Sequence, residues 1–108
     1  MAPPDTAAIK QAGSRANTAI VECRSKRMAG ELKTYVASAE CANPIIMAAY
    51  QQAGYPYMDL ISLMTAKRLE LSEEIDQGKL TVAQAQLKFA QFKVGLDDEE
   101  RQRERGQR

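Results

Sequence analysis

With 108 residues, the chain has room for one domain built around one hydrophobic core. Its 15 basic and 14 acidic residues leave a net charge of +1, which argues against a nucleic-acid or membrane-surface binder, and no apolar run approaches the length of a membrane span. The chain has no histidine and so lacks the commonest general base and the commonest metal ligand, and we expect neither a cofactor nor a metal site.

The first predicted helix begins after Asp5, whose carboxylate can accept hydrogen bonds from the free N–H groups of a first turn. An apolar stripe follows at alternating four- and three-residue steps, at Ile9, Gly13, Ala16, Ile20 and Cys23. Cys23 lies on this stripe and is therefore expected to face the core. We expect Gly30 to end the helix and residues 1–4 to be disordered.

Cys23 and Cys41 are the only cysteines of the chain. An even count in a short chain predicts a disulfide, and a disulfide implies an oxidising compartment. An unbroken helix would hold the two Cα atoms about 27 Å apart, whereas a disulfide needs roughly 4.4–6.8 Å, so the chain must reverse near Gly30. The bond would add roughly 3 kcal/mol to a thin, alanine-rich core. The alternative is a pair of buried, reduced thiols in a cytosolic protein.

Asn43-Pro44 predicts the start of a second helix, with asparagine at the cap and proline at the first helical position. We expect Gly54 to end this helix, because glycine is the preferred residue just past a helix C-terminus. Its buried face would consist of Ile45, Ile46, Ala49, Tyr50 and Ala53.

A third helix is expected to start again at Tyr55-Pro56 and to end at Gly78, with Asp59 in its first turn, where a negative charge favours the helix dipole. Its core stripe would be Leu60, Ile61, Met64, Leu71 and Ile75. Four acidic residues gather near its end, at Glu70, Glu73, Glu74 and Asp76. Paired carboxylates can perform acid–base chemistry or bind metal, but this spacing is more typical of a solvated helix face, which is the interpretation we prefer.

The fourth predicted helix opens with a capping box formed by Thr81 and Gln84. One stripe, expected to fill the core, comprises Val82, Ala85, Phe89, Phe92 and Leu96. A second stripe lies almost opposite and comprises Ala83, Leu87, Ala90 and Val94. A helix with two apolar faces is either central in a bundle or shared with a partner. Polar residues between the stripes favour an edge position, so we expect the second stripe to bind another helix or to form a homodimer.

Residues 97–108 hold five acids and four arginines, including two pairs at i,i+4 spacing with the acid first, Asp97 with Arg101 and Glu99 with Arg103. We expect this segment to be a charged helical extension or a frayed tail, outside a single domain that spans residues 5–96. A nucleic-acid-binding tail would carry the arginines without the acids.

Three tyrosines gather around the turn between the second and third helices, at Tyr50, Tyr55 and Tyr57, with Asp59 beside them. Tyrosine is frequent at recognition surfaces, so this cluster is a candidate partner surface. The alternative, which we prefer, is that the rings pack the turn and close the end of the core.

Several segments resemble a group of small exported helical proteins from α-proteobacteria: Gly30–Val36, Ala39–Pro44, Ala48–Tyr50 and Tyr57–Ile61. The likeness spans about residues 20–95. It implies an exported location and a cysteine pair, and it assigns no catalytic or binding residue. Separately, Ile75–Thr81 followed by Gln84-Ala85 resembles the inter-helix turn of short C-terminal hairpin domains linked to oligomerisation.

The chain opens Met1-Ala2-Pro3-Pro4, with neither a basic start nor an apolar leader segment. Either the protein is cytosolic, or this is a mature form that has lost a leader and gained a methionine. The Ala-Pro-Pro start favours the second explanation.

We therefore predict an all-α, four-helix domain stapled by Cys23–Cys41, acting as a non-catalytic binding or structural module of the cell envelope, periplasmic or secreted. One alternative is a periplasmic inhibitor or chaperone-like protein that grips another protein through the Tyr50–Tyr57 turn or the fourth helix. A second alternative is an enzyme that works through Glu70, Glu74 or Asp59.

Overall fold

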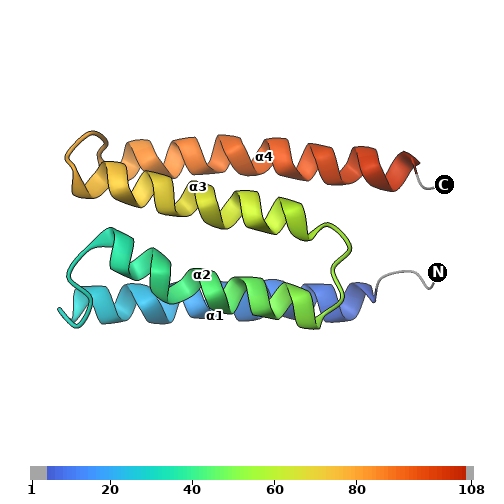
Figure 1. Ribbon diagram of the computed structural model, residues 1–108, viewed down its shortest axis with the longest axis horizontal. Coiled ribbons are helices and arrows are strands. Elements are labelled where there is room, and N and C mark those ends of the chain that lie inside the picture. Colours follow the sequence, from blue (N-terminus) through green and yellow to red (C-terminus); the bar gives the residue numbers. More distant parts are fainter. Residues whose placement is uncertain (1–4, 107–108) are drawn as a thin grey trace.

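The computed structural model describes residues 5–106, which form four helices joined by short turns and contain no strand (Figure 1). The helices are α1 (Thr6–Met28), α2 (Tyr35–Gln52), α3 (Met58–Asp76) and α4 (Val82–Gly106). The predicted all-α, four-helix class is therefore confirmed. Our expectations for residues 1–4 and for the last two residues of the chain lie outside the described residues.

Each helix packs on the next one along the chain: α1 on α2, α2 on α3 and α3 on α4, in antiparallel pairs (Figure 1). The molecule measures 46 × 23 × 16 Å. Among the described residues, no Cα atom of α1 lies within 8 Å of one in α4, although these two helices would be neighbours in a closed four-helix bundle. An open seam therefore separates the first helix from the last.

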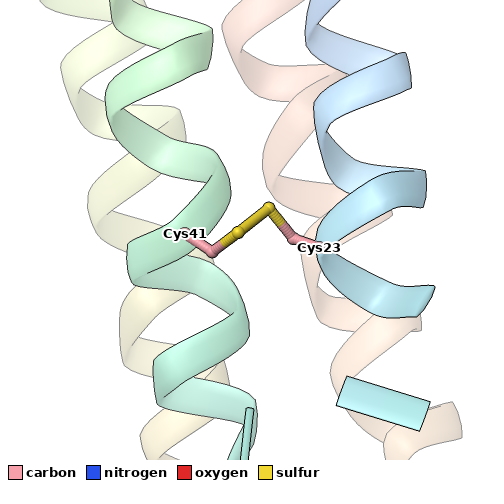
Figure 2. Close-up of a disulfide and its surroundings, with 2 residues drawn as sticks. All are labelled: Cys23 and Cys41. Atoms are coloured by element: carbon pink, nitrogen blue, oxygen red, sulfur yellow. A yellow bond between two sulfur atoms is a disulfide. The ribbon is translucent and has the colours of Figure 1, made fainter. Parts of the chain in front are cut away.

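A disulfide joins Cys23 on α1 to Cys41 on α2, with the two Cα atoms 5.9 Å apart (Figure 2). The bond confirms the predicted staple and the reversal that it requires between the two helices. Cys23 is only 2% exposed, in agreement with its place on the apolar stripe of α1.

Glycine ends the first three helices, as predicted at Gly30, Gly54 and Gly78. Gly30 adopts a φ of +84°, a left-handed conformation that only glycine reaches at no steric cost. The Gly30 N–H donates to the Arg27 carbonyl oxygen, and the Glu31 N–H donates to the Lys26 carbonyl oxygen. This pair of hydrogen bonds is the Schellman motif of a helix end. The same pair of hydrogen bonds recurs at the ends of α2 and α3.

Helix α2 starts at Tyr35, so the prediction that a helix begins at Asn43-Pro44 is wrong. Pro44 lies inside the helix, and the Asn43 side chain donates to the Thr65 carbonyl oxygen of α3 (3.0 Å) instead of capping α2. An internal proline removes one backbone hydrogen bond and costs about 3 kcal/mol. The disulfide at Cys41, one turn earlier, stabilises the protein by a similar amount, roughly 3 kcal/mol. The helix continues through the proline with a change of direction (Figure 1).

The start of α2 is capped from two places in the chain. The Thr34 hydroxyl oxygen accepts a hydrogen bond from the Ala37 N–H (3.0 Å). The Asp76 carboxylate, at the end of α3, accepts hydrogen bonds from the N–H groups of Tyr35 and Val36 (both 2.9 Å). These bonds satisfy amides that a helix start leaves free. Asp76 therefore caps a helix that begins 41 positions earlier in the chain.

The predicted local signals at the starts of α1 and α4 are present. The Asp5 carboxylate accepts hydrogen bonds from Ala7 and Ala8 (3.0 and 3.2 Å). The capping box of α4 is complete, because Gln84 N–H donates to the Thr81 hydroxyl (3.1 Å) and Thr81 N–H donates to the Gln84 side chain (2.9 Å). Helix α4 then continues without a break across residue 96, where we expected the domain to end.

The core lies between α1, α2 and α3, and small side chains make up much of it. Ile46 is its most enclosed large residue, at 0% exposure. Alanines form most of the buried face of α1, at Ala12, Ala16 and Ala19. On α4 only Ala85 is buried, whereas Val82 is 39% exposed and the other residues of its predicted core stripe are half-buried. The stripe is only partly covered because α4 packs on α3 alone.

Candidate ligand-binding cleft

A cleft of about 460 Å³ lies between the α1–α2 hairpin and the α3–α4 hairpin, in the half of the molecule remote from the start of α1 and the end of α4. All four helices line it, and its walls are mainly apolar, formed by Ile20, Ala42, Leu71, Ile75, Ala85 and Phe89 among others. The cleft lies along the open seam between α1 and α4. It exists because the short side chains of α2 that line it, Ser38, Ala39 and Ala42, do not fill the space that α4 leaves uncovered.

Four cationic side chains line the cleft, and no aspartate or glutamate of the described residues does: Arg24, Arg27, Arg68 and Lys93. None of the four forms an ion pair within the part of the chain that the structure describes. The net charge of +1 conceals this arrangement, because the balancing acids lie elsewhere on the surface. The cleft therefore combines an apolar lining with an uncompensated positive charge.

Two of these cations are held against aromatic rings. The Arg27 guanidinium lies 4.1 Å from the centre of the Tyr35 ring, and that of Arg68 lies 4.7 Å from the centre of the Phe89 ring. The Nε atoms of both arginines are buried and have no hydrogen-bond partner among the described residues. Burial lowers the pKa of Arg68 from its ordinary value. Stacking fixes the planes of these charges while leaving their hydrogen-bonding capacity partly unused.

Sequence reasoning did not single out the arginines, although a signal was present. Arg27 continues the four- and three-residue steps of the α1 stripe beyond Ile20 and Cys23. Arg68 occupies the same kind of position on α3, between Met64 and Leu71. A charged residue on a core stripe is rarely buried without a partner, so each position could have been marked as a candidate binding residue.

The tyrosine cluster lies at the other end of the molecule and is mostly enclosed. Tyr55 and Tyr57 are 9% and 7% exposed, and Tyr50 is half-buried. The rings pack edge to face, with centroids 5.4 Å apart for Tyr50 and Tyr55 and 5.6 Å apart for Tyr55 and Tyr57. The three rings thus close the turn between α2 and α3 and present little free surface.

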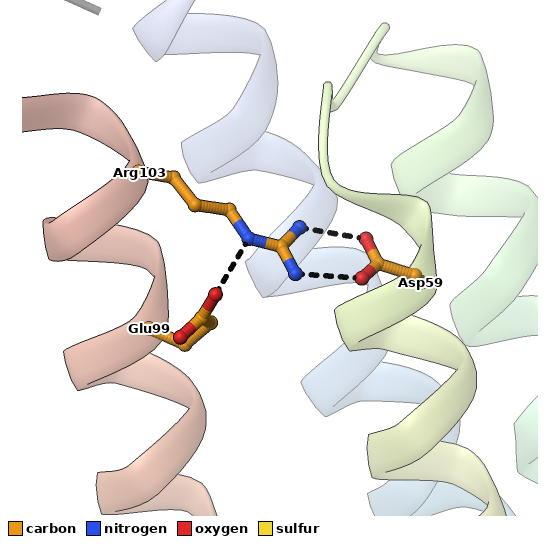
Figure 3. A network of polar contacts seen from close by, with 3 residues as sticks. All are labelled: Asp59, Glu99 and Arg103. Atoms are coloured by element: carbon orange, nitrogen blue, oxygen red, sulfur yellow. Dashed lines mark hydrogen bonds and ion pairs between the residues drawn. The ribbon is translucent and has the colours of Figure 1, made fainter. Parts of the chain in front are cut away.

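The end of α4 is fastened to this turn by a group of polar contacts that we call the C-terminal clamp: Tyr55, Asp59, Glu99, Glu100 and Arg103. Arg103 donates two hydrogen bonds to the Asp59 carboxylate (2.9 and 2.8 Å) and one to Glu99 (3.0 Å) (Figure 3). The Tyr55 hydroxyl donates to Glu100 (2.7 Å). Burial and the adjoining Glu100 carboxylate raise the pKa values of Tyr55 and Tyr50. Residues 97–106 are thus helical and attached to the rest of the molecule.

The second stripe of α4 lies on the surface, with Ala83, Leu87, Ala90 and Val94 all exposed. Leu87 is 61% exposed and Val94 is 59% exposed. Only Ala90 also lines the cleft.

The acidic residues considered as candidate catalytic or metal-binding groups are separated. Glu70 pairs with Lys67 (2.9 Å), and Asp76 caps α2. Within residues 5–106, no group of three or more aspartate, glutamate, cysteine or histidine side chains is placed to hold a metal ion. No helix in this part of the chain is long and apolar enough to cross a membrane.

Neither a protein-family model nor a curated protein nor a solved structure matches this chain. The assignment of a function therefore rests on the cleft, the C-terminal clamp and the disulfide.

We predict that replacing Asp59 by Asn destabilises the protein in a pH-dependent way. The hydrogen bonds from Arg103 lower the pKa of Asp59 below its ordinary value of 3.8, so the folded state favours the ionised carboxylate. Its stabilising contribution is therefore fully present above about pH 4 and is lost as the pH falls through the lower folded-state pKa. Asp59→Asn should melt at a lower temperature than the parent at pH 7, and the difference should vanish in strong acid.

Asp98→Asn is the matched control, because Asp98 forms only a local ion pair with Arg101 on the surface of α4. Its melting temperature should stay close to that of the parent throughout. Equal melting temperatures of Asp59→Asn and Asp98→Asn at pH 7 would contradict a stabilising role of the C-terminal clamp.

Proposed function

We propose that this protein is an exported, non-catalytic binding module and that the cleft between its two hairpins is the binding site. The observation that carries the proposal is a largely apolar cleft of about 460 Å³ lined by all four helices. Small-molecule sites commonly have volumes of about 300–1,000 Å³, apolar walls and a few polar groups, so size and lining both suit a small ligand.

The exported location, periplasmic or secreted, is supported by the Cys23–Cys41 disulfide, because structural disulfides persist in oxidising compartments. The resemblance to exported helical proteins points the same way. A non-catalytic role is supported by the lack of histidine in the sequence and by the ion pairs of the candidate carboxylates Asp59 and Glu70.

A neutral fluorescent probe, N-phenyl-1-naphthylamine, tests the cleft without involving its charge. We expect the probe to bind the parent with an increase in fluorescence. Ala90→Trp places a bulky ring at the wall of the cleft and should weaken binding by at least about tenfold, which corresponds to 1.4 kcal/mol.

Ala83→Trp is the matched control, since Ala83 is also exposed on the same stripe of α4 but does not line the cleft. It should bind the probe as the parent does. Failure of the parent to bind, or equal affinity in all three proteins, would contradict the proposed site.

A second candidate role is self-association through the exposed stripe of α4. Large apolar residues, Leu87 and Val94, alternate there with Ala83 and Ala90, whose short side chains would allow a second copy of the helix to approach closely. Tyr55 and Tyr57 are buried and present little surface to a partner. The exposed stripe of α4 is therefore a better candidate than the tyrosine turn for binding another protein.

Leu87→Glu would place a charge at the centre of this stripe. If the parent is a dimer by light scattering, the variant should be a folded monomer, because burial of an unpaired charge is costly. A parent that stays monomeric at millimolar concentration would exclude the homodimer.

A further inference from the structure

Building on the proposed binding cleft, we infer that its ligand is a fatty acid, with the carboxylate held by the guanidinium groups of Arg27 and Arg68 and the alkyl chain along the apolar seam. Four features of the cleft support this assignment: its positive charge, the guanidinium groups that lack a partner among the described residues, the shape of the seam, and the small number of free backbone donors.

The charge of the cleft selects an anion. Arg24, Arg27, Arg68 and Lys93 line it, none is paired with a carboxylate of the described residues, and no acidic side chain lines the same walls. Apolar walls limit screening by solvent, so these charges raise the local concentration of an anionic ligand more than surface lysines would.

The two arginines select the position of the head group. Their Nε atoms are buried and unpartnered among the described residues, so the donors that a ligand in the cleft can reach are the terminal N–H groups of the two guanidinium groups. A carboxylate suits these donors, because its two oxygens match the fork of a guanidinium. Stacking on Tyr35 and Phe89 already orders these guanidinium groups, so less side-chain freedom is lost on binding.

The seam provides a path for an alkyl chain. A second hollow of about 170 Å³ lies farther along it, and Lys93 lines both spaces. Ile9, Ile61, Met64 and Leu96 contribute apolar walls to this second hollow. Its acidic residues, Asp97 and Glu100, would repel a carboxylate at that end and so favour the orientation with the head group at the arginines.

A carboxylate fits better than a phosphate because most of the backbone donors at the helix starts beside the cleft are already occupied. Phosphate sites typically use the free N–H groups of a helix start. Two helix starts border the cleft, that of α2 at Tyr35 and that of α4 at Val82. The first amides of α2 already donate to Asp76 and Thr34, and the Gln84 amide of α4 donates to Thr81. The donors of the cleft are therefore mainly its arginine and lysine side chains, which suffice for a small monoanion.

The test compares ligands that share one alkyl chain and differ in the head group: decanoate, decanol, decyl phosphate and decyltrimethylammonium. Each is titrated against N-phenyl-1-naphthylamine bound to the intact, oxidised protein. We expect decanoate to displace the probe at a concentration at least about tenfold lower than decanol, the size of one charge-assisted contact. Lengthening the acid by one methylene should strengthen binding about fourfold, until the chain fills the seam.

Arg68→Gln should weaken the binding of decanoate by at least about tenfold relative to the binding of decanol measured on the same variant. Lys67→Gln is the matched control: Lys67 is the neighbouring cation, yet it pairs with Glu70 on the surface and does not line the cleft. Lys67→Gln should change the affinity of neither decanoate nor decanol. If Arg68→Gln fails to fold by circular dichroism, Arg27→Gln serves the same purpose.

The outcomes separate this inference from the proposed function. The fatty-acid assignment would be overturned if the parent binds the probe and decanol but shows no preference for decanoate. It would also be overturned if the Arg68→Gln variant keeps that preference. Either result would leave the proposed binding cleft intact. Tighter binding of decyl phosphate than of decanoate would overturn the carboxylate head group. Failure of the probe itself to bind would remove the cleft and the inference together.

Discussion

The bond between Cys23 and Cys41 fixes the α1–α2 hairpin, on which the other helices are built. The buried face of α1 is largely alanine, and alanine burial contributes little hydrophobic free energy. A crosslink worth roughly 3 kcal/mol is therefore a large part of the total stability. It also holds the first half of α2 against α1 ahead of Pro44, so the helix continues through a residue that would ordinarily end it.

Small side chains of α2 account in part for the cleft. Because α4 packs on α3 alone and the α2 wall includes the short residues Ser38, Ala39 and Ala42, the seam between the first and last helices stays open. Arg27 and Arg68 lie on the core stripes of their helices and face this seam instead of a packed interior. The C-terminal clamp fastens α4 at the opposite end, through Arg103 and Asp59, so the helix stays attached where its apolar packing is weakest.

Features encoded within a few residues were predictable from the sequence. The three glycine helix ends and the caps at Asp5 and Thr81 follow from local rules of backbone geometry. The disulfide was predictable for another reason, because the chain has only two cysteines. The start of α2 was missed because Asn43-Pro44 carries a stronger local start signal than the single cap residue Thr34, and because the second cap, Asp76, lies 41 positions away. The ion pair between Arg103 on α4 and Asp59 on α3 was also missed, because the two residues are 44 positions apart in the sequence. The cleft depends on which two helices fail to meet, and no local pattern specifies that.

The most direct test of this account is urea unfolding of the protein before and after reduction of its disulfide. If the Cys23–Cys41 bond holds together a hairpin that alanine packing alone stabilises weakly, reduction should lower the free energy of unfolding by roughly 3 kcal/mol. Superimposable unfolding curves for the oxidised and reduced proteins would contradict the central role given to this bond.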